Sequence, residues 1–295
     1  NLVNIAASAI ATIIGIRLLG DVYGVLAATI ILTLGILIFA EVTPKTLAAL
    51  YPEKIAFPSS LILSLLFLTK AVKSQDFISS LETPLPFKIS NNAVAGAMLN
   101  GVPHVYSFCG IDSLKNYRGI NLKGFRYNTS SKTWDTIPDV PDTRGKIAAG
   151  ASTVDSIIYI IGGYHVDNRG NEVSSNKIHR YNINTNSYLS DGTNIPVATD
   201  DHVQAVWKDS LIYVITGWNN TSNIPNVQIY NPISNSWSAG NPVPNNNTYK
   251  SFGASGTIVG NTIYYYGGAS SASGFSIQNI LRIGEINPLN PTQIS

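Results

Sequence analysis

Two long uncharged runs open the chain, and a polar repeat follows them. Val22–Ala40 contains 19 residues without a charged side chain. At about 1.5 Å rise per residue, a helix of that length nearly spans a bilayer core of roughly 30 Å. Asn1–Ile16 is also uncharged, and the turn Arg17–Asp21 separates the two runs. A buried helix pair in a soluble protein is the alternative, but two such runs this close together would need an unusually large core. The pattern therefore predicts transmembrane α-helices at the N-terminus.

From residue 83 to residue 295 the pattern changes to short apolar strands that end in glycine. The strands are Val105–Gly110, Ile158–Gly163, Ile212–Gly217 and Ile263–Gly268, and their final glycines are spaced by 53, 54 and 51 residues. A turn-forming pair precedes each strand, so each unit of about 50 residues predicts a four-stranded antiparallel sheet. Glycine at the strand end permits a positive φ or a close backbone approach. These glycines are Gly110, Gly162, Gly163, Gly217, Gly267 and Gly268.

A second aromatic pattern recurs later in each unit. The pairs stand seven residues apart, and they are Tyr127 and Trp134, Tyr181 and Tyr188, and Tyr230 and Trp237. Large side chains at such positions serve as anchors between neighbouring sheets. A β-sandwich also alternates strands and turns, but it does not predict a fourfold recurrence of Tyr-x-x-x-Gly. The fold class is therefore mixed, with N-terminal transmembrane helices followed by an all-β propeller of about four blades.

The glycine pairs and the spaced aromatics resemble the kelch motif, whose repeats are near 50 residues long. In the fourth unit Ile283 stands where the pattern calls for tyrosine. Kelch propellers usually close with six or seven blades, so the resemblance implies an incomplete array that continues beyond Ser295. This half also distantly resembles the kelch-fold sialic-acid epimerases.

Three N-terminal motifs resemble the transmembrane domain of the cyclin-M/CorB–CorC family, which is linked to Mg²⁺ export. They are Asn1–Ser8, Ile38–Thr46 and Ala49–Ala56. The resemblance implies Mg²⁺ ligands at Asn4 and Glu41, with Asn1 as a further candidate. From the residues alone, a carboxylate and amides at membrane depth suit a hard cation. Equally, Glu41 could lie among headgroups while Asn4 bonds neighbouring helices.

The segment Pro58–Gln75 lies where the two halves meet. Its uncharged core, Ser59–Thr69, is about half a bilayer span and resembles the apolar region of a signal peptide. The predicted division is a partial transmembrane domain over 1–58, an apolar or signal-like seam over 59–82, and propeller blades over 83–295. We interpret the seam as the junction of an ion-transporter fragment with a secreted kelch protein.

Charge and cysteine content exclude several classes of function. The net charge of +2 over 295 residues gives no clustered basic face, so no nucleic-acid partner is expected. The single Cys109 excludes an intramolecular disulfide framework and a multi-cysteine zinc site, and it is expected to be a small buried strand residue.

Candidate chemistry in the repeat half is sparse. The histidines are His104, His165, His179 and His202, with no His-x-x-x-His or His-x-Glu spacing. The run Asp200-Asp201-His202 looks like an acid–base cluster, but aspartate is also common turn chemistry. Arg144 and Arg180 could bind an acidic sugar in a propeller channel, or they could simply be blade-edge residues. No catalytic residue is assigned, and no cofactor is expected other than Mg²⁺ at the membrane domain.

Three functions follow from these patterns. The preferred one is a membrane-associated propeller that binds a protein or glycan without catalysis, with the lipid bilayer as a second partner. The alternatives are divalent-cation transport by the N-terminal half and a sugar-modifying activity in the propeller. The expected location is the inner or plasma membrane of a bacterium, with the propeller periplasmic or extracellular.

Overall fold

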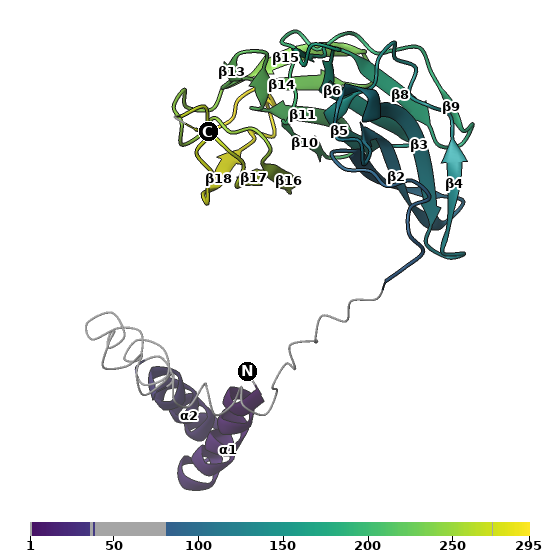
Figure 1. Ribbon diagram of the computed structural model, residues 1–295. Helices are drawn as coiled ribbons and strands as arrows, with labels where there is room; N and C mark the ends of the chain where they lie inside the picture. Colours follow the sequence, from purple (N-terminus) through teal and green to yellow (C-terminus); the bar gives the residue numbers. More distant parts are fainter. Residues whose placement is uncertain (1, 36–37, 39–80, 273) are drawn as a thin grey trace. The chain divides into compact units, whose positions relative to one another are not determined.

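A computed structural model describes residues 2–35, 38, 81–272 and 274–295, and the chain divides into two units, 1–80 and 81–295 (Figure 1). The first unit contains helix α1 (Leu2–Leu19) and helix α2 (Asp21–Gly35). Gly20 joins them with a φ of +80°, and its N–H donates to the carbonyl of Ile16 at 2.9 Å. The turn predicted over Arg17–Asp21 is thus shorter than expected, because α1 continues to Leu19 and α2 begins at Asp21.

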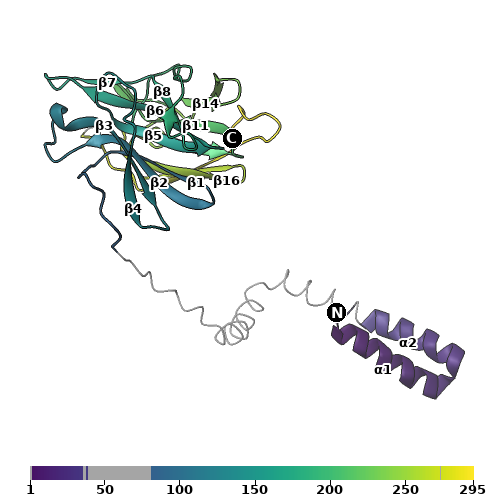
Figure 2. The same cartoon turned by 90° about the vertical axis from the view of Figure 1, so that its right-hand side faces the viewer.

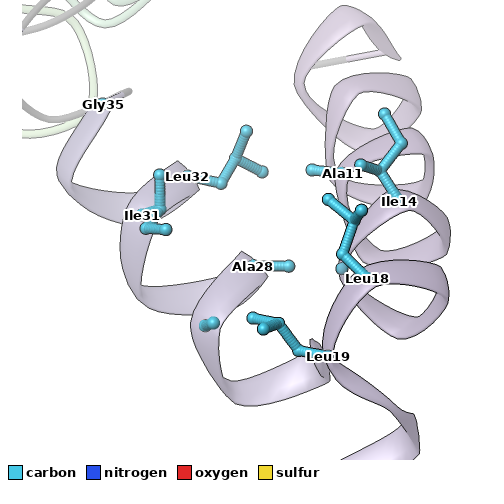
Figure 3. Close-up of a pocket in the computed structure, with 10 residues that line it drawn as sticks. Ala11, Ile14, Leu18, Leu19, Ala28, Ile31, Leu32 and Gly35 are labelled. Atoms are coloured by element: carbon cyan, nitrogen blue, oxygen red, sulfur yellow. The ribbon is translucent and has the colours of Figure 1, made fainter. Parts of the chain in front are cut away.

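The two helices touch backbone to backbone at a pair of glycines. A Cβ atom placed on Gly24 would lie 2.3 Å from the carbonyl oxygen of Gly15, so only glycine permits this approach. Figure 3 shows the apolar groove of about 720 Å³ beside this crossing, with side chains from both helices directed toward it. It is lined by Ala11, Ile14, Gly15, Leu18, Leu19, Ala27, Ala28, Ile31, Leu32 and Gly35.

The expectation of a membrane span over Val22–Ala40 is not met by the residues that the structure describes. Helix α2 is described for 15 residues, which at 1.5 Å rise per residue cover about 22 Å of a core of roughly 30 Å. Within the described ranges, no helix has both the length and the hydropathy needed to cross a membrane. The seam segment 59–80 lies outside the described residues.

In the described residues, the second unit contains four antiparallel sheets of three or more strands, which we call blades 1 to 4 in chain order, and one two-stranded hairpin. Blade 1 contains β1 (Ala93–Leu99), β2 (Val102–Ile111), β3 (Ile120–Asn128) and β4 (Thr133–Ile137), with the short helix η3 (Tyr117–Gly119) between β2 and β3. Blade 2 contains β5 (Ile147–Val154), β6 (Ile157–Val166), β8 (Ile178–Asn182) and β9 (Ser187–Tyr188), and β7 (Glu172–Ser174) pairs with β6.

Blades 3 and 4 repeat this order. Blade 3 contains β10 (Val203–Trp207), β11 (Leu211–Ile215), β14 (Val227–Asn231) and β15 (Ser236–Gly240), and a separate hairpin consists of β12 (Trp218–Asn219) and β13 (Ser222–Asn223). Blade 4 contains β16 (Ser255–Val259), β17 (Thr262–Tyr266) and β18 (Leu281–Glu285). The N–H and C=O of Ser295 both bond to Glu285, so the last residue extends this sheet beyond β18. The predicted four-blade propeller is confirmed.

The blades stand side by side (Figure 2). Contacts between their innermost strands follow the order β1, β5, β10, β16. A separate apolar core fills each of the three spaces between successive blades. Pairs of tyrosines bridge neighbouring blades within these cores. The ring of Tyr106 in blade 1 lies 5.9 Å from that of Tyr181 in blade 2. Tyr159 in blade 2 likewise lies 5.7 Å from Tyr230 in blade 3.

The aromatic pairs spaced by seven residues face each other across the third and fourth strands of their blades. Their ring centroids are 5.1 to 5.2 Å apart in Tyr127–Trp134, Tyr181–Tyr188 and Tyr230–Trp237. In blade 4 the strand register places Gly284, not Ile283, at the position that corresponds to Tyr230. A Cβ atom on Gly284 would meet Ile294 at 3.1 Å, so a residue from the end of the chain fills the space of the absent aromatic ring.

Each predicted glycine pair is a two-residue left-handed bend at the end of the second strand. Cys109 and Thr216 occupy the first position in blades 1 and 3 with φ of +58° and +54°, whereas glycine occupies the second position in all four blades. In blades 1 to 3 the N–H of that second glycine donates to a carbonyl in the segment that leads into the next innermost strand. The bonds are Gly110 to Lys146 at 2.9 Å, Gly163 to Thr199 at 3.1 Å, and Gly217 to Ser251 at 2.9 Å.

A second set of backbone bonds, the inter-blade ladder, runs around the innermost strands. Its members are Asn91, Ala148, Asp201 and Gly253, which all have positive φ. Each N–H donates to the equivalent carbonyl of the preceding blade, at 3.2 Å for Ala148 to Asn91, 3.0 Å for Asp201 to Ala148 and 2.7 Å for Gly253 to Asp201. Main-chain atoms therefore set the spacing of the blades.

Candidate binding site at the loop end of the propeller

Two kinds of loop meet at one end of the propeller, which we call the loop end. One kind enters each innermost strand from the preceding blade, and the other leaves each second strand after its left-handed bend. They meet because the first and second strands of a blade are antiparallel, so the start of one lies beside the end of the other. The bond from Gly163 to Thr199 joins one loop of each kind. Loops held on a rigid scaffold are common carriers of binding function.

A polar cavity of about 210 Å³ lies where the four innermost strands begin. All four blades contribute to its lining, which is Asn92, Ala93, Val94, Ala149, Gly150, Ala151, His202, Val203, Gln204, Ala254, Ser255 and Gly256. A Cβ atom on Gly150 would lie 2.3 Å from Oε1 of Gln204 and 2.7 Å from Nε2 of His202. Glycine at position 150 therefore leaves room for the two largest polar side chains of the cavity.

Hydrogen bonds fix the state of these two side chains. The amide of Gln204 donates from Nε2 to Oγ of Ser152 at 2.6 Å and to the carbonyl of Tyr159 at 3.1 Å. Its Oε1 is thus the acceptor for Nε2 of His202 at 3.2 Å, so the proton of the imidazole is on Nε2. Burial lowers the pKa of His202 to about 4, and the ring is neutral at physiological pH.

A buried carboxyl, Asp200, and a half-buried one, Asp201, lie next to this cavity. Ser174 donates from Oγ to Oδ2 of Asp200 at 2.5 Å. Burial raises the pKa of Asp200 to about 7, although the hydrogen bond from Ser174 lowers it. The negative charges of Asp201 and Glu172 raise it further. Burial and the charge of Glu172 also raise the pKa of Asp201 to about 6. The predicted Asp200-Asp201-His202 run is therefore a site where one carboxyl is protonated near neutral pH.

Replacement of Asp200 by Asn is expected to change the pH dependence of stability. The folded carboxyl keeps its proton up to about pH 7, whereas in the unfolded chain it loses the proton near pH 4. Between these values the folded state binds more protons, so the wild-type chain loses stability as pH rises. We expect Asp200→Asn to match the wild type at pH 4 and to be more stable by about 2 kcal/mol or more at pH 8.

Denaturant unfolding followed by circular dichroism from pH 4 to pH 8 measures this difference. The matched control is Asp139→Asn, because Asp139 is an exposed aspartate in the loop after β4. Parallel pH profiles for Asp200→Asn and the wild type would contradict the assignment.

Three aromatic rings gather on the loop end beside Asp200. The backbone of Trp218 pairs with that of Asp200, and its ring lies 5.1 Å from Phe252 and 5.7 Å from Phe275. Phe252 and Phe275 are 5.6 Å apart, and more than half of the Phe275 side chain is exposed. Sequence reasoning missed this group because its members lie in loops without a period. The one available signal was the bulky Trp218 directly after a structural glycine.

A buried charge network fastens the loop that enters blade 2 to that blade at the loop end. Nζ of Lys146 lies 2.9 Å from Oδ2 of Asp142, and both side chains are buried. His179 lies between two carboxylates, with Nε2 at 3.1 Å from Asp142 and Nδ1 at 2.9 Å from Asp191. His165 donates from Nδ1 to the carbonyl of Gly145 at 2.8 Å, and its Nε2 lies 3.7 Å from Oδ2 of Asp142. His165 and His179, far apart in sequence, thus meet at Asp142.

The two arginines predicted to bind an acidic sugar occupy different settings. Arg180 lies on β8, where Nε donates to the carbonyl of Ser190 at 2.7 Å and Nη2 to its Oγ at 2.9 Å. Arg144 is exposed in the loop between β4 and β5. No interaction within the described ranges joins them, so a joint role in sugar binding stays a prediction.

The predicted metal ligands of the N-terminal half cannot be placed in a site. Asn1 and Glu41 lie outside the described residues, and for Asn4 only its position on α1 is described. In the part of the chain that is described, no group of three or more His, Cys, Asp or Glu side chains is arranged to hold a metal ion.

Two different family models match the two units. The model of the cyclin M transmembrane N-terminal domain matches residues 1–71, and the kelch motif model matches residues 148–188 and 208–244. Residues 1–71 are a cyclin M segment, and kelch motifs lie in blades 2 and 3 of the four-blade propeller. Both predicted resemblances are confirmed.

The cyclin M segment has closely similar relatives. Over 64 residues, or 22% of this chain, it is 64% identical to the UPF0053 inner membrane protein YfjD of Escherichia coli (strain K12). It is 59% identical over 64 residues to a UPF0053 protein of Haemophilus influenzae. The chain spans only 15% of the length of either relative.

The kelch unit resembles a solved structure. The structure of YjhT superposes with a TM-score of 0.52 and 19% identity, covering 70% of this chain and 64% of YjhT. At that identity the similarity supports the propeller fold alone.

Proposed function

We propose that this protein is a membrane-attached kelch propeller that binds a glycan at its loop end. The proposal rests on the aromatic group of Trp218, Phe252 and Phe275. This group lies next to Asp200 and to the polar cavity at the start of the innermost strands. An exposed aromatic ring offers a flat apolar surface for the carbon face of a sugar ring. Carboxylate, amide and hydroxyl groups nearby suit the sugar hydroxyls, and sites of this kind combine apolar area with a few placed polar groups.

Attachment to a membrane is the second part of the proposal. Its support is the 64% identity between the cyclin M segment and a stretch of a protein named as an inner membrane protein. In this arrangement the segment holds the propeller near a bilayer, and the loop end is left for the ligand. A bacterial inner membrane, with the propeller on its outer side, is the expected location.

Phe275→Ala is expected to weaken glycan binding about two- to tenfold, because an aromatic contact contributes roughly 0.5–1.5 kcal/mol. The full chain is extracted from the membrane fraction of expressing bacteria and applied to a glycan array. The best glycan is then titrated against the wild-type chain and the variant. Ile233→Ala is the matched control, since Ile233 is an exposed apolar residue in the turn between β14 and β15.

The outcomes separate the two parts of the proposal. Absence of the chain from the membrane fraction contradicts attachment. Binding to no glycan, or equal weakening by Phe275→Ala and Ile233→Ala, contradicts the proposed site. Binding to a protein in place of a glycan would keep the propeller as a binding module and change its ligand class.

A further inference from the structure

A pocket of about 340 Å³ opens on the outer part of blade 3. One wall is the loop that enters this blade, with Pro196 and Val197, and the other is β15, whose residues 237–240 all line the pocket. In the described residues, β15 is the outermost strand of its sheet. Successive side chains of a strand point to opposite faces, so the pocket reaches the free edge of β15. It shares no lining residue with the polar cavity or with the aromatic group of the loop end.

Blade 1 contains an equivalent position. In blades 1 and 3 the indole N–H of the tryptophan on the outermost strand donates to the carbonyl of a threonine in the segment that packs on it. The two bonds are Trp134 to Thr83 at 2.9 Å and Trp237 to Thr193 at 2.7 Å. Phe87 and Val197 each lie four residues after these threonines. Val197 in the wall of the pocket therefore holds the place of Phe87.

An aromatic ring closes this position in blade 1. The ring of Phe87 stacks on Phe125 with centroids 6.5 Å apart, and Nζ of Lys123 lies 4.2 Å from the centroid of Phe87. Strand register makes Gln228 the counterpart of Phe125, because both pair with the residue three before the second glycine of the bend. Gln228 bonds only the main chain of Val197, accepting from its N–H at 2.8 Å and donating to its carbonyl at 3.0 Å. Blade 3 thus has no ring at this position.

Blade 2 fills the same position with charged groups. His179 is the counterpart of Phe125 and Gln228 in the strand register. Its Nε2 lies 3.1 Å from Oδ2 of Asp142, whose side chain is 5% exposed. Among the described residues, the position is therefore filled by a ring in blade 1 and by a carboxylate in blade 2. It is open in blade 3.

We propose that this pocket binds an aromatic side chain of a partner protein, carried on an extended segment that pairs with the free edge of β15. A ring fits because the same scaffold already holds one in blade 1. Trp237 also packs against the apolar core between blades 2 and 3, so a ring in the pocket extends an existing core. An extended segment fits because an outermost strand offers unpaired backbone groups to another strand. The small, exposed Ser238 and Ala239 leave room beside that edge.

A blocked pentapeptide, Thr-Val-Phe-Val-Thr with one fluorine on the ring, tests the proposal. It is titrated with the full chain in detergent, and binding is followed by fluorine magnetic resonance. We expect its signal to shift and broaden, and unlabelled peptide to reverse the change. The same peptide with alanine or leucine in place of phenylalanine is expected to compete at least about tenfold less well, because it lacks the ring that fills the pocket.

Val197→Phe is the main variant of the protein, because it fills the pocket from its own wall as Phe87 does in blade 1. We expect it to weaken peptide binding at least about tenfold and to keep the unfolding midpoint of the wild type. Val259→Phe is the matched control, since Val259 is 63% exposed on β16 and lies outside the pocket. Ala239→Asp is a second variant at an exposed position, and its charge is also expected to weaken binding at least about tenfold.

The outcomes decide each part of the proposal. Absence of binding up to the solubility limit of the pentapeptide overturns it, and equal competition by the leucine peptide overturns the aromatic ligand. Unchanged binding in folded Val197→Phe overturns the assignment to this pocket. If Val197→Phe does not fold, unchanged binding in Ala239→Asp overturns that assignment. Binding of 4-fluorotoluene as tight as that of the pentapeptide overturns the part assigned to the edge of β15.

Discussion

Gly217→Ala is expected to lower the free energy of unfolding of the propeller by about 4 kcal/mol. Position 217 has a φ of +101°, where an L-residue with a Cβ is strained by about 1–2 kcal/mol. The new Cβ would also lie 2.6 Å from the carbonyl oxygen of Asp200 and 2.8 Å from Cβ of His202. Neither neighbour is the free end of a flexible side chain, so the backbone must shift, and overpacking adds about 1–3 kcal/mol. Guanidinium unfolding followed by circular dichroism measures the loss.

Gly260→Ala separates the two causes. Gly260 also has a positive φ, at +62°, but a Cβ there would meet no atom within 4 Å. The control therefore contains the backbone strain alone and is expected to cost about 1 kcal/mol. Equal losses for the two variants would show that crowding against the loop that enters blade 3 does not constrain Gly217.

Asp142→Ala is expected to cost about 3–5 kcal/mol, because it leaves the buried Lys146 ammonium without its carboxylate. The side chain of Lys146 is fully buried 2.9 Å from Asp142, so water cannot replace the lost partner without opening the junction of blades 1 and 2. The double variant Asp142→Ala, Lys146→Met removes both charges and is expected to recover most of this loss. If the double variant is less stable than Asp142→Ala, the network does not act as a compensated pair.

The same network gives an acid dependence with a defined sign. Burial by itself would raise the pKa of Asp142, but the hydrogen bond from His179 and the charge of Lys146 outweigh it and hold the pKa well below its usual range. The carboxylate therefore stabilises the fold at pH values above about 4, and this contribution falls as the pH drops below that value. Unfolding measured from pH 2 to pH 6 should show a shallower acid loss in the double variant than in the wild type.

The blades could be predicted from the sequence because their signals are local and periodic. The left-handed bend needs glycine at its second position, so Gly110, Gly163, Gly217 and Gly268 recur at a constant spacing. The cross-strand aromatic pairs also recur with a fixed spacing, because the same two strands pair in each of blades 1 to 3. The first position of the bend does not require glycine, because Cys109 and Thr216 adopt a positive φ there.

The candidate site could be predicted only in part. The adjacent Asp200 and Asp201 are visible in the sequence, but their raised pKa values come from burial under loops of another blade. His165 and His179 looked scattered because the contact that joins them runs through Asp142 in the loop entering blade 2. Local spacing does not report contacts between loops of successive blades, so the network and the aromatic group were found only in three dimensions.

The inter-blade ladder has a consequence for how this protein can change during evolution. Its four positions hold asparagine, alanine, aspartate and glycine, and the bonds between them use only main-chain atoms. A blade can therefore be duplicated, deleted or exchanged between genes without rewriting its neighbours, provided that its second glycine and its apolar faces come with it. Each blade can therefore be inherited as a unit. Its loops can acquire a new specificity while the main-chain bonds between blades stay the same.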